Sequence, residues 1–107
     1  MKLLFVCSRN RLRSPTAEAL FSESHGVETA SAGTSPDADN PISSDLVEWA
    51  DIIFAMENIH RKRLNESFKS LLRAKRIVVL GIADKYQYMD PELIQILKTK
   101  LGKYLNP

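Results

Sequence analysis

One short stretch of the chain combines a nucleophile, a side chain suited to phosphate and the start of a helix. Five residues separate Cys7, the single cysteine, from Arg13, and Ser14-Pro15 follows at once. A thiol near arginine side chains and a helix N-terminus ionises readily, and the thiolate is the nucleophilic form of cysteine. The planar guanidinium of Arg13 can bind two oxygens of a phosphate group. The spacing therefore predicts attack of the Cys7 sulfur on phosphorus.

The elements on either side of this stretch would hold it in place. An apolar, β-prone run at residues 3–6 predicts a buried strand, and Ser14-Pro15 predicts a helix start with a hydroxyl N-cap. A loop that enters a helix presents free backbone N–H groups and the positive end of the helix dipole to an anion. The expected phosphate-binding residues are therefore those that follow Cys7, namely Ser8, Arg9, Asn10, Arg11, Leu12, Arg13 and Ser14.

The residues around this loop resemble the signature of a known family. Their pattern is Val6-Cys7-x5-Arg13-Ser14-Pro15-x-Ala17-Glu18-Ala19. It is similar to the pattern of the low-molecular-weight protein tyrosine phosphatases, in a short bacterial form. The resemblance implies a cysteine-dependent phosphatase that hydrolyses phosphotyrosine in proteins, or a related aryl phosphate, through a phosphocysteine intermediate. It implies neither a metal nor a cofactor.

The resemblance also assigns supporting roles within the loop. In the family, the serine of a Ser-Ala-x-Thr segment hydrogen-bonds the loop asparagine, and Ser31 and Asn10 match these two residues. The counterpart of Ser14 hydrogen-bonds the nucleophilic sulfur and eases its departure. Two positions differ from the family, because Arg9 stands where glycine is usual and Leu12 replaces a cysteine that many members carry.

The reaction needs a proton donor that later acts as a base, and a carboxyl group can do both. Two aspartates follow the last predicted strand. Asp90 precedes Pro91 and Glu92, which is the pattern of a helix N-cap, so capping explains this residue. Asp84 has no such explanation, and it matches the aspartate of the family's Ile-Pro-Asp-Pro-Tyr-Tyr stretch. We therefore expect Asp84 to be the general acid and keep Asp90 as the alternative.

Other aromatic and basic residues have more than one interpretation. Tyr86 and Tyr88 are predicted to form an aromatic wall for a phosphotyrosine ring, unless at least one of them packs in the core. His25 is expected at the surface near a helix end, and His60 is expected to be exposed among basic residues. The basic stretch over residues 61–76 is interpreted as a solvated helix face.

The rest of the chain alternates short apolar runs with helical periodicity. Strands are expected near residues 3–6, 27–30, 52–56 and 77–80. Helices are expected over 14–25, from 44 or 45 with Ser44 or Asp45 as N-cap, from 58 toward 72, and from 91. The alternation predicts an α/β fold of three layers, in which helices cover both faces of a four-stranded parallel sheet and the phosphate-binding loop follows the first strand. Residues 1–107 are expected to form a single domain.

Composition narrows the possible partners and location. A formal net charge of +2 does not predict nucleic-acid binding, and no apolar run reaches the length of a membrane span. A single cysteine excludes an internal disulfide, and the apolar run after Lys2 is too short for a signal peptide. We therefore expect a cytoplasmic protein whose partner is a phosphotyrosine-containing protein or a small aryl phosphate. The sequence does not indicate an oligomeric state.

Two other functions fit parts of the same pattern. Arsenate reductases share this loop and fold, but a chain with only Cys7 would need an external thiol to complete that reaction. A non-catalytic domain that binds phosphorylated protein or RNA would use the arginine-rich loop and the basic stretch. The binding domain predicts anion affinity that persists when Cys7 becomes serine, without turnover.

Overall fold

A parallel sheet of four strands, in the order β2-β1-β3-β4, forms the middle of the molecule. In the computed structural model, which describes residues 1–105, the strands are β1 (Lys2–Cys7), β2 (Glu28–Gly33), β3 (Ile52–Ala55) and β4 (Arg76–Val79). β1 pairs with β2 from Lys2↔Glu28 to Cys7↔Gly33, and with β3 from Leu3↔Ile52 to Val6↔Ala55. The predicted four-stranded parallel sheet is confirmed.

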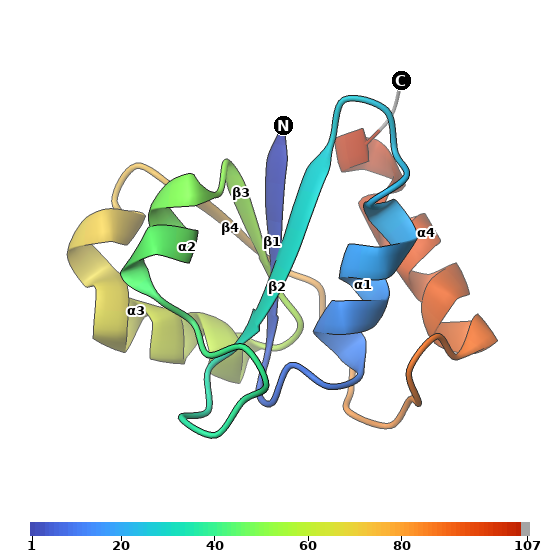
Figure 1. Ribbon diagram of the computed structural model, residues 1–107, viewed down its shortest axis with the longest axis horizontal. Coiled ribbons are helices and arrows are strands. Elements are labelled where there is room, and N and C mark those ends of the chain that lie inside the picture. Colours follow the sequence, from blue (N-terminus) through green and yellow to red (C-terminus); the bar gives the residue numbers. More distant parts are fainter. Residues whose placement is uncertain (106–107) are drawn as a thin grey trace.

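Helices cover both faces of this sheet (Figure 1). α1 (Arg13–Phe21) and α4 (Pro91–Leu105) lie against one face, and α2 (Ser44–Trp49) and α3 (Asn58–Leu72) lie against the other. Two hydrophobic clusters correspond to these layers, one containing Phe21 and Leu97 and the other containing Val47 and Leu64. The three-layer α/β architecture expected from the alternating pattern is therefore present.

The apolar run before the cysteine is buried because β1 lies between two other strands and under both helical layers. Leu3, Leu4, Phe5 and Val6 have no exposed surface. Successive side chains of a strand point to opposite faces, so Leu3 and Phe5 join one cluster while Leu4 and Val6 join the other. The end of β1, where Cys7 lies, is consequently fixed by strands on both sides and by packing on both faces.

The connection order reverses between β1 and β3, which is where parallel α/β sheets place their ligands. α1 carries the chain from β1 to β2, and α2 then returns it past β1 to β3 on the opposite face. The loops after β1 and β3 therefore meet at the carboxyl edge of the sheet, at the bottom of Figure 1.

Several boundaries differ from those predicted. α1 ends at Phe21 rather than near His25, because the backbone turns through Ser24 and Gly26, the latter with a φ of 75°. β2 continues through Gly33, since Ser31 and Ala32 pair with β1 instead of forming a turn. Ser43, not Ser44 or Asp45, caps α2 by accepting a hydrogen bond from the Leu46 N–H. Among residues 1–105, no helix is long and apolar enough to cross a membrane.

Candidate active site

Cys7 lies at the carboxyl end of β1 with its sulfur held by a hydroxyl group. The Cys7 Sγ is 2.9 Å from Ser14 Oγ, and the side chain is only 3% exposed. The Asn10 Nδ2 donates to the same Ser14 oxygen at 2.9 Å. Because an amide nitrogen can only donate, Ser14 accepts from Asn10 and has its own proton available for the sulfur. The Ser14 hydroxyl can therefore donate a hydrogen bond to the Cys7 sulfur.

The backbone of the phosphate loop is compatible with its residues. Asn10 has a φ of 58°, the left-handed conformation that asparagine tolerates better than most residues. Arg9 is not among the residues with positive φ, although it stands where glycine is usual in the resembling family. The loop therefore adopts its turn through Asn10 and does not require glycine at position 9.

The first turn of α1 leaves its backbone N–H groups to the loop. α1 begins at Arg13, so Leu12 is its N-cap residue and no side chain caps the helix. The predicted capping role of Ser14 is wrong, because its hydroxyl contacts Cys7 instead. Uncapped N–H groups at a helix start, next to a thiol and arginine side chains, suit a bound anion.

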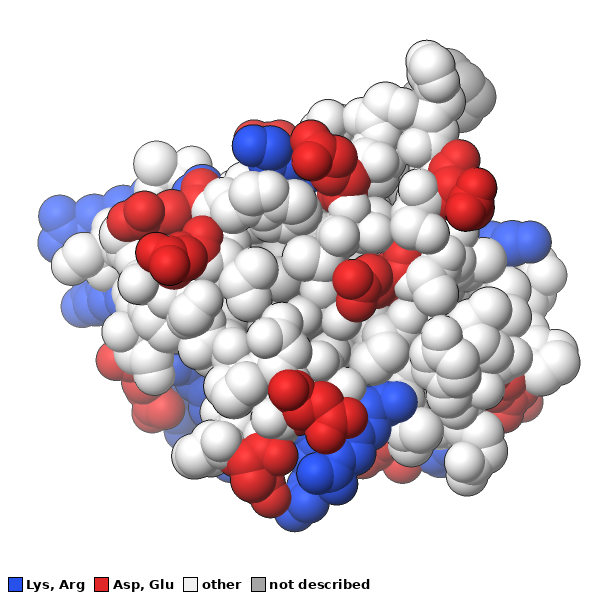
Figure 2. Space-filling model, in the orientation of Figure 1, with Lys and Arg blue, Asp and Glu red and all other residues white. Residues whose placement is uncertain are grey.

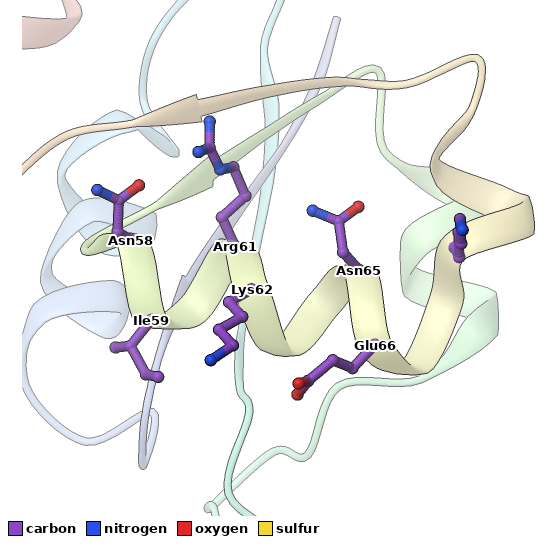
Figure 3. Close-up of a pocket in the computed structure, with 7 residues that line it drawn as sticks. Asn58, Ile59, Arg61, Lys62, Asn65 and Glu66 are labelled. Atoms are coloured by element: carbon purple, nitrogen blue, oxygen red, sulfur yellow. The ribbon is translucent and has the colours of Figure 1, made fainter.

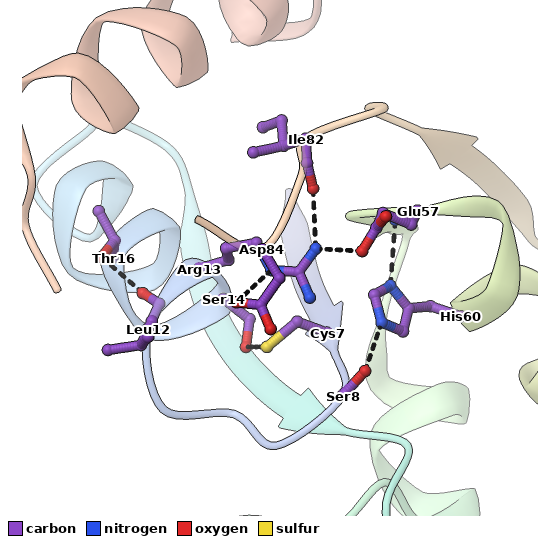
Figure 4. A network of polar contacts seen from close by, with 10 residues as sticks. All are labelled: Cys7, Ser8, Leu12, Arg13, Ser14, Thr16, Glu57, His60, Ile82 and Asp84. Atoms are coloured by element: carbon purple, nitrogen blue, oxygen red, sulfur yellow. Dashed lines mark hydrogen bonds and ion pairs between the residues drawn. The ribbon is translucent and has the colours of Figure 1, made fainter. Parts of the chain in front are cut away.

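Arg13 is buried and oriented by groups from two other segments (Figure 4). Its side chain is 3% exposed, and its Nη1 donates to Glu57 Oε1 at 2.5 Å and to the Ile82 carbonyl oxygen at 2.8 Å. Glu57 lies just after β3, and Ile82 lies in the segment after β4. A guanidinium fixed in this way needs little reorganisation to bind a phosphate.

Asp84 reaches the same place from the segment between β4 and α4. Its Oδ1 lies 3.7 Å from Arg13 Nε, and its side chain is 64% exposed. A cavity of about 470 Å³ is lined by these two residues and by Cys7, Ser8, Arg9, Arg11 and Leu12. The structure therefore brings the predicted nucleophile, the phosphate-binding arginine and the preferred acid to one cavity.

Asp90 lies at a different place and has a structural role. Its Oδ1 accepts a hydrogen bond from the Glu92 N–H at 2.9 Å, at the start of α4. It does not line the cavity that contains Cys7. This geometry supports the interpretation of Asp90 as a helix cap and leaves Asp84 as the carboxyl group beside the nucleophile.

His60 was expected to be exposed, and that prediction is wrong. The side chain is 1% exposed; its Nε2 lies 2.9 Å from Ser8 Oγ, and its Nδ1 accepts from the Glu57 N–H at 3.0 Å. Burial and the nearby Arg13 guanidinium lower the pKa of His60 from 6.5 to about 4. The ring is therefore neutral at pH 7, with its proton on Nε2 and directed at Ser8. Glu57 and His60 form a capping box at the start of α3, but they differ from the Ser/Thr and Glu/Gln residues usual in that motif, so the sequence carried no clear signal for this role.

Three other site predictions need correction. Ser31 was expected to hydrogen-bond Asn10, but its hydroxyl donates to the Glu18 carboxylate and so ties β2 to α1. Tyr86 is only 7% exposed and packs in the hydrophobic cluster under α1 and α4, which was the alternative to its role in a substrate wall. Tyr88 is 52% exposed, and neither tyrosine lines the cavity at Cys7.

A second hollow lies along the outer side of α3 and has no comparable chemistry. Asn58, Arg61 and Asn65 extend to one side of the helix, whereas Ile59, Lys62 and Glu66 extend to the other (Figure 3). These side chains do not converge on a common point, which agrees with the interpretation of the basic stretch as a solvated helix face. Within residues 1–105, no three His, Cys, Asp or Glu side chains gather where they would hold a metal ion.

Comparisons with known proteins agree with this geometry. A family model described as low molecular weight phosphotyrosine protein phosphatase matches residues 2–43, which include the phosphate loop and β2. A protein-arginine-phosphatase of Bacillus subtilis (strain 168) is 30% identical over 95 aligned residues. That alignment covers 64% of this chain and 63% of the relative, so the match spans less than two thirds of the relative's length.

Solved structures resemble the chain over nearly its whole length. A YwlE mutant from Bacillus subtilis has a TM-score of 0.76 at 25% sequence identity, covering 100% of this chain and 99% of the other. Vibrio vulnificus Wzb in complex with benzylphosphonate has a TM-score of 0.78 at 21% identity, covering 97% and 96% of the two chains. The second likeness supports the fold alone.

Proposed function

We propose that the chain, whose residues 2–43 match the model of the low molecular weight phosphotyrosine protein phosphatase family, removes phosphate from phosphoproteins through a phosphocysteine intermediate. The observation that carries this proposal is the cavity in which Cys7, Arg13 and Asp84 meet. A buried guanidinium, a hydroxyl group on the sulfur and an exposed carboxyl group supply the three functions that the reaction needs.

In the first step, the Cys7 sulfur attacks phosphorus and the bond from phosphorus to the leaving oxygen breaks. Arg13 and the backbone N–H groups of residues 8–14 bind the equatorial oxygens, where negative charge is distributed in the transition state. Asp84 gives its proton to the leaving oxygen, so the departing group is a neutral phenol or alcohol. The Cys7 sulfur then carries the phosphoryl group.

In the second step, water releases the phosphate from sulfur. The Asp84 carboxylate accepts a proton from the attacking water, the sulfur–phosphorus bond breaks and inorganic phosphate forms. Ser14 stabilises the departing thiolate through the contact of 2.9 Å between its Oγ and the Cys7 Sγ. The free thiol must stay reduced for both steps, so the cytoplasm is the proposed location.

The proposed substrate is phosphotyrosine in a protein, or a related aryl phosphate. Arg9 and Arg11 line the Cys7 cavity, and although each is paired with an aspartate, their guanidinium groups disfavour a leaving group that becomes a guanidinium itself. An uncharged phenol leaves such a site without this repulsion, and the Leu12 side chain offers an apolar contact for its ring. The match to a protein-arginine-phosphatase makes phosphoarginine the second candidate.

The first experiment compares the purified protein with a Cys7→Ser variant on p-nitrophenyl phosphate, without added metal. We expect turnover in the wild type only. Turnover in neither protein between mildly acidic and neutral pH would contradict the proposal, and retained phosphate affinity would then support the non-catalytic binder. Arsenate reduction, with an external thiol as the reductant, is assayed on the same pair.

The second experiment decides between the two substrates. The kcat/KM values for matched phosphotyrosine and phosphoarginine peptides are measured with the wild type. We expect the phosphotyrosine peptide to be preferred. A higher value for phosphoarginine would overturn the tyrosine assignment and leave the phosphocysteine mechanism in place.

A further inference from the structure

The side chains of two arginines in the phosphate loop bind neither the reacting phosphate nor the leaving group in the mechanism above. Arg9 and Arg11 both line the cavity that contains Cys7, and their side chains are 59% and 49% exposed. Arg13, two residues farther along, is 3% exposed and turned inward. The loop therefore presents one guanidinium to the reacting phosphate and two at the rim of the cavity.

Each rim arginine makes a single contact with an acidic partner. Arg9 Nη1 lies 3.4 Å from Asp37 Oδ2, and Arg11 Nε donates to Asp39 Oδ1 at 3.2 Å. Among residues 1–105, neither guanidinium makes another hydrogen bond or ion pair. A guanidinium has five N–H donors, so most donors of both side chains remain open to a ligand.

The acidic partners belong to a segment that is attached firmly to the phosphate loop. The Thr34, Ser35 and Asp39 N–H groups donate to the carbonyl oxygens of Cys7, Ser8 and Arg9 respectively. The Ser35 hydroxyl and Arg9 lower the pKa of Asp37, which keeps its carboxyl group charged. Both carboxylates thus stay at the rim, behind the arginines rather than inside the cavity, which neither of them lines.

This arrangement holds the guanidiniums in position without binding them tightly. Figure 2 shows basic and acidic side chains side by side at the lower edge of the molecule, where these loops lie in Figure 1. Exposed ion pairs are individually weak, because water and salt screen them. An anionic group on a substrate can therefore replace Asp37 or Asp39 at little cost.

We propose that Arg9 and Arg11 form a second anion-binding subsite, which selects phosphopeptides with acidic residues next to the phosphorylated residue. The assignment rests on the proposed phosphatase function and deepens it. The scissile phosphate occupies the floor at Cys7 and Arg13, and a neighbouring carboxylate of the peptide pairs with a rim guanidinium. Asp37 and Asp39 act as internal competitors that the acidic substrate displaces.

The test compares two phosphotyrosine peptides that differ only in their flanking residues, glutamate in one and glutamine in the other. For the wild type at low salt, we expect kcat/KM to be about two- to fivefold higher for the glutamate peptide per ion pair formed. The preference should shrink as salt is added, because the pairs are exposed. p-Nitrophenyl phosphate, which has no second anion, is measured alongside.

Substitutions of the two partners in the Arg11–Asp39 ion pair are expected to have opposite effects. Arg11→Gln should reduce the preference for the glutamate peptide, whereas Asp39→Asn should increase it by removing the competitor. Lys62→Gln, which removes an exposed positive charge on α3, is the matched control and should leave the preference unchanged. A purely structural role for the Arg11–Asp39 pair predicts that both pair variants act in the same direction.

The possible outcomes separate this inference from the proposed function. Equal kcat/KM values for the two peptides, with normal turnover of p-nitrophenyl phosphate, would overturn the subsite and leave the phosphatase in place. An Asp39→Asn variant that lowers the preference would also overturn it. Turnover of none of the three compounds would instead contradict the phosphatase function on which the inference rests.

Discussion

The floor and the rim of the cavity use the same residue type in opposite ways. Arg13, on the floor, is 3% exposed and hydrogen-bonds Glu57 and the Ile82 carbonyl oxygen. Arg9 and Arg11, on the rim, are 59% and 49% exposed, and each makes one contact with an aspartate. The difference in burial and pairing fits the two proposed roles, which are a fixed reaction geometry at the floor and a variable partner at the rim.

The physical reason is the cost of burying charge. An arginine taken out of water must be paired, and Glu57 supplies that partner for Arg13. The pair is then oriented before substrate arrives, which favours stabilisation of a transition state. The rim arginines keep most of their hydration, so their ion pairs can exchange without leaving a buried charge unpaired.

Arg13→Lys should have the largest effect in this comparison. Lysine keeps the positive charge but loses the planar fork and the bonds to Glu57 and Ile82, so turnover of p-nitrophenyl phosphate should fall about 10²–10³-fold. Arg61→Lys, on the exposed side of α3, is the matched control and should retain activity. Wild-type kcat in Arg13→Lys would mean that the fixed fork is not needed.

Asp84→Asn should have the second-largest effect. Turnover should fall about 10²-fold, because asparagine cannot donate a proton to the leaving group. The loss should be larger for phenyl phosphate than for p-nitrophenyl phosphate, whose leaving group is less basic. Asp90→Asn is the control, since the side chain caps α4 and does not line the Cys7 cavity. The reverse pattern, with Asp90→Asn inactive and Asp84→Asn active, would make Asp90 the acid.

Gly33→Ala tests how the segment that carries Asp37 and Asp39 is attached to the phosphate loop. A Cβ at this position would lie 2.5 Å from both the Ser8 carbonyl oxygen and the Ala38 Cβ, so the two loops would have to separate. We expect a loss of about 1–3 kcal/mol in the free energy of unfolding, measured with urea. Gly102→Ala in α4, where an added Cβ meets nothing, should not destabilise the protein. Equal free energies of unfolding for Gly33→Ala and the wild type would show that the two loops can separate without loss of stability.

The last prediction concerns the pH dependence that His60 contributes to stability. Its pKa is about 4 in the folded protein and 6.5 ordinarily, so the unfolded chain binds a proton that the folded chain does not between these values. The contribution is complete above pH 6.5 and is lost as the pH falls toward 4, at most about 1.4 kcal/mol per pH unit.

His60→Gln removes this titration and keeps a polar side chain beside Ser8. Urea unfolding at several pH values should therefore give the wild type a steeper loss of stability than the variant between pH 6.5 and 4. Parallel curves would mean that the buried ring does not titrate as its surroundings imply.

Much of the floor was predictable because its residues are close together in the sequence. The strand, the loop and the helix start form one continuous segment, so the order of residues around Cys7 determines how they wrap an anion. Asp84 was found by a different route, since helix capping explained Asp90 and left Asp84 without a structural role. The alternating apolar runs predicted the sheet, because a strand buried on both faces must be apolar on both.

The errors concern residues whose environment comes from distant segments. His60 lies among basic residues in the sequence and looked exposed, but the turn after β3 places its ring against Ser8, 52 residues away. Ser31 matched a family contact, yet its hydroxyl donates a hydrogen bond to Glu18 of α1 instead. Tyr86 is near Asp84 in the sequence, but its ring points into the core.

The sequence by itself determined the fold, and it predicted the nucleophile and the phosphate loop, because these depend on local spacing and on the period of apolar residues. Only the tertiary structure decided which arginine is buried and which are exposed. Arg9, Arg11 and Arg13 alternate along one short loop and look equivalent in the sequence. Their different surroundings arise because Glu57 and Ile82 reach Arg13 from the segments after β3 and β4, whereas Asp37 and Asp39 meet the other two at the water-exposed rim.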